Sequence, residues 1–179
     1  HNGIIDNARD IRKRLEKKGY VLKSETDSET LAHMITIGME SGQTPIEAVR
    51  QTLKRLTGTW GLCVLFKDHE QIICARNGSP LLIGKGDGES FVSSDPHALS
   101  HHTQNIFFLE DGDLAIIDRD GVEITRLEGG VSDTSMTVVE DEWEEADIGG
   151  YPHFMLKEIH EQPEACLLYT SDAADDQLG

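Results

Sequence analysis

The hydrophobic pattern of this chain changes its period at Trp60, and this change limits the folds open to it. Before Trp60, apolar residues such as Ile46 and Val49 recur three or four positions apart, which is the spacing of an amphipathic helix. After it, short apolar segments alternate with turn pairs such as Asn77-Gly78, which is typical of hairpins. Because closely spaced strands with short turns pair antiparallel, the pattern predicts an α+β fold with helices covering one face of a mostly antiparallel sheet.

Three helices are expected before Trp60. The first spans residues 7–18. The second should begin at Thr26, because Thr26 and Glu29 have the spacing of a capping box, in which Glu29 reaches back to the cap. The third should begin at Thr44, which repeats the capping-box spacing with Glu47 and has Pro45 in the first helical position. The strands expected after Trp60 lie at residues 60–66, 71–76, 81–85, 90–93, 105–109, 113–117 and 122–126.

The charge of the chain excludes some kinds of partner. The 179 residues include 16 Lys and Arg against 33 Asp and Glu, which gives a formal net charge of -17. So acidic a chain is not expected to bind the phosphates of nucleic acid or an anionic membrane surface. No apolar run approaches the roughly 20 residues that cross a bilayer, so no membrane partner is predicted.

The cysteines and histidines predict neither a disulfide framework nor a metal site. Three cysteines at irregular spacings are a poor disulfide set. Cys63 and Cys74 lie in apolar strand-like segments, where we expect both to be small buried hydrophobic residues. A reducing, cytoplasmic setting is therefore expected. The histidines at 97, 101 and 102 have no nearby cysteine and no HExxH spacing, so zinc is not expected either.

Both ends of the chain look unusual. It begins at His1 rather than Met, and we expect that residues are missing before it. Residues 140–147 place six acids around Trp143, which indicates a solvated linker. Residues 166–179 begin inside an expected helix, and their first eleven (CLLYTSDAADD) resemble a translated library adapter. We therefore divide the chain into a domain at 1–138, a linker at 139–165 and an adapter-derived tail at 166–179.

Two short motifs could carry chemistry. In Asn2-Gly3, the asparagine side chain and the glycine N–H could both donate to one oxygen, which is how an oxyanion hole is assembled; the same pair can also be a simple turn. Asp27, at a helix start, could hold a ligand ammonium or only compensate the helix dipole. The glycine-rich residues 83–88 lack the phosphate-loop pattern and are expected to form a hairpin turn.

Several segments together resemble a known family. Residues 1–5 (HNGII) and 24–29 (SETDSE) are similar to the glutaminase domain of class II glutamine amidotransferases. Further segments narrow the resemblance to the glutamine–fructose-6-phosphate aminotransferase family. These are residues 75–81 (ARNGSPL), 91–95 (FVSSD), 109–113 (LEDGD) and, most specifically, 153–163 (HFMLKEIHEQP).

The resemblance implies a fold and a mechanism. The fold is the N-terminal-nucleophile hydrolase αββα sandwich, here incomplete because its first strands are missing. In the family, an N-terminal cysteine attacks the glutamine amide with its own α-amino group as base. The released ammonia converts fructose 6-phosphate to glucosamine 6-phosphate in a separate isomerase half, without a metal or organic cofactor. Asn2 and Gly3 match the oxyanion hole, Asp27 matches the residue that holds the substrate ammonium, and the full-length enzyme is expected to be a cytoplasmic homodimer.

The chain also departs from the family pattern. The nucleophilic cysteine belongs upstream of His1, and neither Cys63 nor Cys74 can replace it, since both lie mid-chain without a free α-amine. Ile148 occupies a position where the family commonly has a lysine. We therefore expect this fragment to be inactive alone and poorly soluble. The alternatives are another class II enzyme, such as an amidophosphoribosyltransferase, or a non-catalytic glutamine-binding module.

Overall fold

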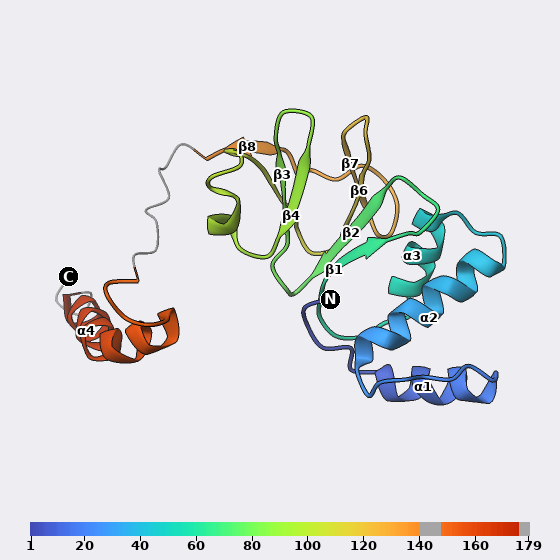
Figure 1. Cartoon of the computed structure of the whole chain (residues 1–179), viewed down its shortest axis with the longest axis horizontal. Helices are drawn as coiled ribbons and strands as arrows, with labels where there is room; N and C mark the ends of the chain where they lie inside the picture. Colours follow the sequence, from blue (N-terminus) through green and yellow to red (C-terminus); the bar gives the residue numbers. More distant parts are fainter. Residues whose placement is uncertain (140–147, 176–179) are drawn as a thin grey trace. The chain divides into compact units, whose positions relative to one another are not determined.

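The computed structural model describes residues 1–139 and 148–175, which belong to two compact units, residues 1–141 and 142–179. The described part of the first unit contains three α-helices and two four-stranded sheets, and that of the second contains one helix (Figure 1). The acidic residues 140–147, predicted to be a solvated linker, lie outside the described residues.

The three expected helices form at α1 (Ala8–Lys17), α2 (Asp27–Glu40) and α3 (Pro45–Leu53). The capping box of α3 is confirmed, because Thr44 Oγ1 accepts the Glu47 N–H and the Glu47 carboxylate accepts the Thr44 N–H. Each such cap satisfies backbone N–H groups that the first helical turn leaves unpaired.

The capping box predicted at α2 is wrong in its partners. Thr26 is the N-cap residue but makes no side-chain cap bond. Glu29 instead accepts the backbone N–H groups of Lys23 and Ser24, at 2.6 and 2.7 Å. The Lys23 N–H and the Ser24 hydroxyl are the main causes that lower the pKa of Glu29 to about 2. The Thr26 N–H donates to Ser24 Oγ at 3.3 Å instead of to Glu29.

The strands form two antiparallel sheets rather than the single sheet that the pattern predicted. The first sheet has the order β1 (Trp60–Leu65), β2 (Ile72–Asn77), β6 (Asp113–Ile117), β7 (Val122–Arg126). The second has the order β4 (Ser90–Ser93), β3 (Leu82–Lys85), β5 (Asn105–Phe108), β8 (Met136–Val138). Sequence spacing identified the first seven strands in chain order but could not show that β2 pairs with β6 instead of β3.

The layers follow from the two-residue alternation of the strands. In β2, Ile73 and Ala75 belong to the core cluster that contains the buried residues of the three helices, whereas Cys74 belongs to the cluster that contains residues of both sheets. On the far face of the second sheet, Leu82 and Ile106 are covered by Leu99 of the short helix η1 (Pro96–Leu99). The order of layers in this unit is therefore helices, first sheet, second sheet.

The two central cysteines differ in exposure. Cys74 is fully buried, as expected for a small hydrophobic residue, but Cys63 is exposed. The prediction that both are buried is therefore wrong for Cys63. It lies on β1, an edge strand, where Leu65 on the same face is 76% exposed.

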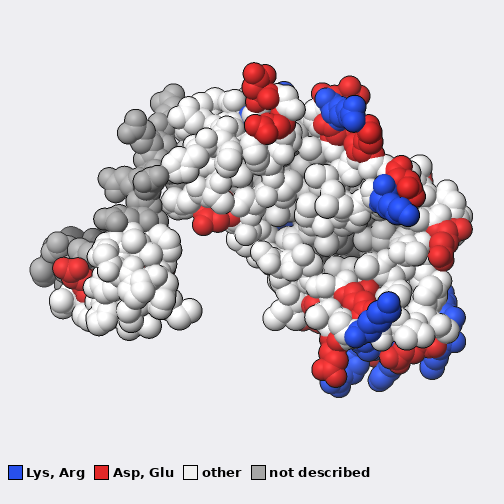
Figure 2. Space-filling view, in the orientation of Figure 1, with Lys and Arg blue, Asp and Glu red and all other residues white. Residues whose placement is uncertain are grey.

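Positive charge is concentrated on α1 in this acidic chain. Ile11 and Leu15 of α1 are buried in the core, and the basic residues lie on its remaining surface. Six of the 16 Lys and Arg residues fall between positions 9 and 18, and Figure 2 shows blue side chains gathered over this helix. The acidic excess is consequently carried by the rest of the chain.

The second unit is described through α4 (Phe154–Asp175), which begins near Pro152 as expected. The helix continues through Pro163 and across the predicted start of the foreign tail at residue 166. The foreign origin of that tail stays a prediction. No helix among the described residues is long and apolar enough to cross a membrane.

Candidate functional site

Residues 2–5 run antiparallel to the start of β1, which fixes the Asn2-Gly3 pair in place. Asn2 and Gly61 exchange both backbone hydrogen bonds, at 3.0 and 2.7 Å. One step along, Ile4 and Thr59 also exchange both bonds, at 3.1 and 2.9 Å. The backbone of this segment is thus held as a short strand at the sheet edge, while Asn2 itself remains exposed.

Gly3 occupies a position that only glycine accommodates. Its φ is +126°, outside the range that other residues adopt readily. A Cβ atom there would lie 2.3 Å from the Thr59 carbonyl oxygen and 3.0 Å from Ser79 Oγ. Gly3 therefore brings two distant segments, at Thr59 and Ser79, against residues 1–5.

Asp27 lies beside the same segment although it is more than 20 positions away. As the first residue of α2, it accepts the Ile5 N–H on Oδ2 at 2.9 Å. Its other oxygen, Oδ1, is 3.8 Å from His1 Nδ1 and 3.4 Å from the Ser28 hydroxyl. The Asp27 side chain is 27% exposed. One carboxylate oxygen is thus used to anchor residues 1–5, and the other is less firmly engaged.

His1 lies beside Asp27 and Ser28 at the start of α2. Its imidazole is only 4% exposed, and Nδ1 is 2.9 Å from Ser28 Oγ. The fold thus brings Asn2, Gly3 and Asp27 to one corner, at the start of α2 and the edge of the first sheet. The structure gives no direct contact between the Asn2 side chain and Asp27, and their catalytic and binding roles remain predictions.

Two other segments on which the family resemblance rests are connected by hydrogen bonds to the strand that holds residues 1–5. The Asn77 amide donates to the Gly58 carbonyl at 2.9 Å, and Gly58 pairs with Ile5. The Gly78 N–H donates to Asp111 Oδ1 at 2.8 Å, and Arg76 pairs with the same carboxylate at 3.4 Å. The sequence alone gave residues 75–81 and 109–113 no role. In the structure they bond to each other and, through Gly58, to the segment at residues 1–5.

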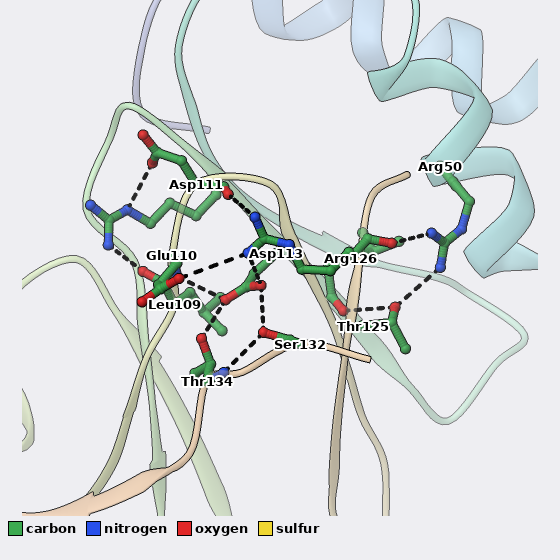
Figure 3. Close-up of polar contacts among 11 residues, drawn as sticks. Arg50, Leu109, Glu110, Asp111, Asp113, Thr125, Arg126, Ser132 and Thr134 are labelled. Atoms are coloured by element: carbon green, nitrogen blue, oxygen red, sulfur yellow. Dashed lines mark hydrogen bonds and ion pairs between the residues drawn. The ribbon is translucent and has the colours of Figure 1, made fainter. Parts of the chain in front are cut away.

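A buried carboxylate, Asp113, stands at the start of β6 and binds groups from several neighbouring segments (Figure 3). Its side chain is fully buried and accepts the hydroxyls of Ser132 and Thr134, at 2.7 and 2.6 Å. It also accepts the Glu110 N–H at 2.8 Å and pairs with Arg126 at 2.9 Å. Burial opposes ionisation of Asp113, but the hydrogen bonds outweigh it and lower its pKa below the ordinary value.

The histidines that the sequence analysis considered as zinc ligands have other neighbours in the structure. His97 pairs with Asp95 at 2.9 Å, and the His102 ring lies against Phe91, with ring centroids 4.7 Å apart. Among the residues that the structure describes, no group of three His, Cys, Asp or Glu side chains could hold a metal ion. A surface cleft formed by the turns near residues 69–72, 85–90 and 117–121 contains none of the candidate residues.

Comparison with known proteins identifies the class of this arrangement. Residues 1–101 match the family described as glutamine amidotransferase domain. Two solved structures have a TM-score of 0.61 and 26% identity over 73% of the chain. One is titled as the allosteric regulatory enzyme of purine biosynthesis, and the other as the glutamine phosphoribosylpyrophosphate amidotransferase of B. subtilis. The matched region is 28–29% of the length of those two chains. The chain belongs to the glutamine amidotransferase family.

Within that family, the relatives found by sequence are all one kind of enzyme among those described here. The glutamine–fructose-6-phosphate aminotransferase (isomerizing) of Thermus thermophilus is 44% identical over 165 residues, which are 91% of this chain and 27% of that protein. The same enzyme of Xylella fastidiosa is 44% identical over 180 residues, covering all of this chain and 29% of that protein. The chain is thus homologous to the glutaminase domain of this aminotransferase, and it spans less than a third of the length of these relatives.

Proposed function

We propose that this chain supplies part of the glutamine-hydrolysing domain of an isomerizing glutamine–fructose-6-phosphate aminotransferase. The observation that carries the proposal is the convergence of Asn2, Gly3 and Asp27 at one corner, together with 44% identity to those enzymes. In this proposal the fold is an incomplete N-terminal-nucleophile hydrolase sandwich. Glutamine is the substrate, fructose 6-phosphate receives the ammonia elsewhere in the enzyme, and the whole enzyme is a cytoplasmic homodimer.

The chemistry assigned to this corner is the stabilisation of charge. When a nucleophile attacks the side-chain amide of glutamine, negative charge develops on the amide oxygen. The Asn2 side chain and the Gly3 N–H are the donors proposed to receive that oxygen, and donors fixed in advance lower the barrier because they need no reorganisation. The ladder to Gly61 and Thr59 provides this rigidity.

Asp27 is proposed to bind the α-ammonium group of glutamine. Oδ1 is the oxygen available for this, since Oδ2 accepts the Ile5 N–H. An ammonium ion near a carboxylate gains a charge-assisted hydrogen bond, which is stronger than a neutral one. Because the same residue fixes residues 1–5, substrate position and oxyanion donors would share one rigid support.

The attacking group is not provided by the residues of this corner. The first cysteine of the sequence is Cys63, and it lies within β1. Covalent catalysis needs an activated nucleophile, which donors alone do not replace. We therefore expect the 179-residue polypeptide to release glutamate from glutamine no faster than the uncatalysed background. Turnover above that background would contradict this assignment.

The roles of Asn2 and Asp27 are tested in the complete enzyme encoded by the same gene. Asn2→Ala should lower kcat for glutamine hydrolysis by about 10²–10³-fold, as for loss of one oxyanion donor. Asp27→Asn should raise KM for glutamine more than it lowers kcat, because it weakens binding of the ammonium. Asp10→Asn, an exposed carboxylate in the first turn of α1, is the matched control and should change neither constant. Equal effects of Asp10→Asn and Asp27→Asn would refute the role of Asp27.

Two other functions remain as alternatives. An amidophosphoribosyltransferase shares the fold, but the solved structures of that kind are 26% identical to this chain, against 44% for the fructose-6-phosphate enzymes. Ammonia transfer to fructose 6-phosphate, measured in the complete enzyme, distinguishes the two. A non-catalytic glutamine-binding module would bind glutamine as the 179-residue chain alone, and isothermal titration tests that.

A further inference from the structure

A cavity of about 430 Å³ lies between α1, α2 and the segment that follows α3. Binding sites for small molecules typically have volumes of about 300–1,000 Å³. The described residues that line this cavity are either apolar or positively charged, and none of them is acidic. The cations are Arg14, Lys17, Lys18 and Arg55. Since the chain has 33 acidic residues against 16 basic ones, this grouping is contrary to its overall charge.

Helical spacing places two of these cations beside the apolar part of the cavity. Arg14 follows the buried Ile11 by three positions, and Lys18 follows the buried Leu15 in the same way. Side chains three or four positions apart are neighbours on the surface of a helix. Arg14 and Lys18, which are four apart, therefore lie next to each other along the apolar stripe of α1.

Met34, Ile37 and Arg55 line the cavity from other elements. Met34 and Ile37 lie three positions apart on α2 and are only half-buried, so they offer apolar surface to a ligand. The Arg55 carbonyl accepts the side-chain amide of Asn7 at 2.8 Å. This bond fixes the backbone of Arg55 beside the start of α1.

The side chains of the four cations make no ion pair or hydrogen bond within the described part of the chain. By contrast, Arg12 on the same helix donates to the Thr26 carbonyl at 3.0 Å. Arg14 and Lys17 lie in the last turn of α1, where positive charge stabilises a helix through its dipole. That role does not explain Arg55, which belongs to another segment. The grouping therefore favours an anionic ligand.

We propose that this cavity binds a small organic phosphate that has an apolar body. A phosphate monoester carries close to two negative charges at neutral pH, and guanidinium groups bind phosphate through paired hydrogen bonds. Arg14 and Arg55 are the groups that bind the phosphate in this way, and Lys18 supplies a third positive charge. The apolar body contacts Met34 and Ile37, and its removal from water favours binding.

The cavity lies apart from the corner proposed for glutamine. Asn2 pairs with Gly61, so the chain immediately before His1 continues along β1 at the edge of the first sheet. The cavity is lined instead by the helices and the short segments next to them. Met34 lies about 10 Å beyond Asp27 along α2, since each helical residue adds about 1.5 Å. The inference therefore does not rest on the proposed glutamine chemistry.

The test titrates the full 179-residue chain, and then the complete enzyme, with 1-naphthyl phosphate, which joins a phosphate to a flat apolar ring system. The fluorescence of the naphthyl group should report saturable binding with a Kd below about 1 mM. 1-Naphthol and inorganic phosphate, which each contain one part of the probe, should bind at least about tenfold more weakly. The complete enzyme is titrated with saturating fructose 6-phosphate, so that sites for that sugar phosphate are filled.

Two double variants locate the site. Arg14→Gln with Lys18→Gln should weaken binding of the probe at least about tenfold, because it removes two charge-assisted contacts. Arg9→Gln with Lys13→Gln makes the same change of charge on the same helix, but neither residue lines the cavity. This control should change the Kd less than about twofold. All four residues are exposed, so both variants should keep the fold, and circular dichroism checks this.

Three results would overturn the proposal. The first is that the complete enzyme does not bind the probe, and the second is that either part of the probe binds as tightly as the whole. The third is an equal loss in the two double variants, which would show a general attraction to the positive charge of α1. Failure of this test would leave the glutaminase assignment unaffected, since none of the residues assigned to it is altered.

Discussion

Replacing Asp113 by asparagine should destabilise the first unit more than any surface change. The carboxylate is fully buried and accepts four groups, from Ser132, Thr134, Arg126 and the Glu110 backbone. Asparagine has nearly the same size, but it has one acceptor oxygen and presents an NH2 group to at least one donor. Hydrogen bonds to a charged group contribute about 1.5–3 kcal/mol each, and breaking a buried ion pair costs about 3–5 kcal/mol.

We therefore expect Asp113→Asn to lower the free energy of unfolding by about 3 kcal/mol, a large part of the roughly 5–15 kcal/mol typical of a domain. Urea unfolding of the dilute chain, followed by circular dichroism, measures this loss. The control is Asp133→Asn, which alters an exposed carboxylate in the same loop and should cost less than about 0.5 kcal/mol. A loss for Asp113→Asn no greater than that of the control would refute the reasoning.

The pH dependence of the same pair of proteins provides a second check. The folded pKa of Asp113 is below its ordinary value of 3.8, so folding favours the ionised form. Its contribution is fully present above the unfolded pKa and is lost as pH falls through the folded pKa. The stability gap between wild type and Asp113→Asn should therefore be constant near neutral pH and should narrow below about pH 4. A gap that widens in acid would contradict the assigned charge state.

Three further changes test other parts of the structure. Thr44→Ala removes the cap of α3 and should cost about 1 kcal/mol in urea unfolding. Arg50→Met removes guanidinium bonds to the Arg126 and Leu127 carbonyls, and a loss below about 0.5 kcal/mol would show that they do not hold α3 to β7. Gly3→Ala places a methyl group against the Thr59 carbonyl. It should therefore speed hydrogen exchange at the Thr59 amide, and unchanged exchange would mean that the segment relaxes without losing its ladder.

Local patterns in the sequence predicted the elements well. The change of period at Trp60 and the turn glycines located seven of the eight strands, and the Thr44 capping box located the start of α3. These features depend on residues close together in the chain. The eighth strand, Met136–Val138, was missed because all three of its residues are exposed, so it has no buried alternation to detect.

Features built from distant residues were not predictable in this way. Ser132 and Thr134 reach Asp113 from 19 and 21 positions away, and nothing in the spacing indicates that meeting. The exposure of Cys63 depends on β1 being an edge strand, which is a property of sheet order rather than of the strand's own sequence. Asn2, Gly3 and Asp27 were selected by family resemblance and chemical type, and only the fold shows that Asp27 anchors the Asn2-Gly3 segment through Ile5.

The bond from the Ile5 amide to Asp27 gives this corner a built-in reporter. Protection of the Ile5 amide from hydrogen exchange measures the free energy needed to separate residues 1–5 from the Asp27 carboxylate. A cation bound at the other carboxylate oxygen would restrict the same side chain and should lengthen that protection. By linkage, the free energy by which such a ligand stabilises this contact equals the free energy by which the contact strengthens binding of the ligand. The order of residues 1–5 and the affinity of this corner for such a ligand are therefore thermodynamically coupled.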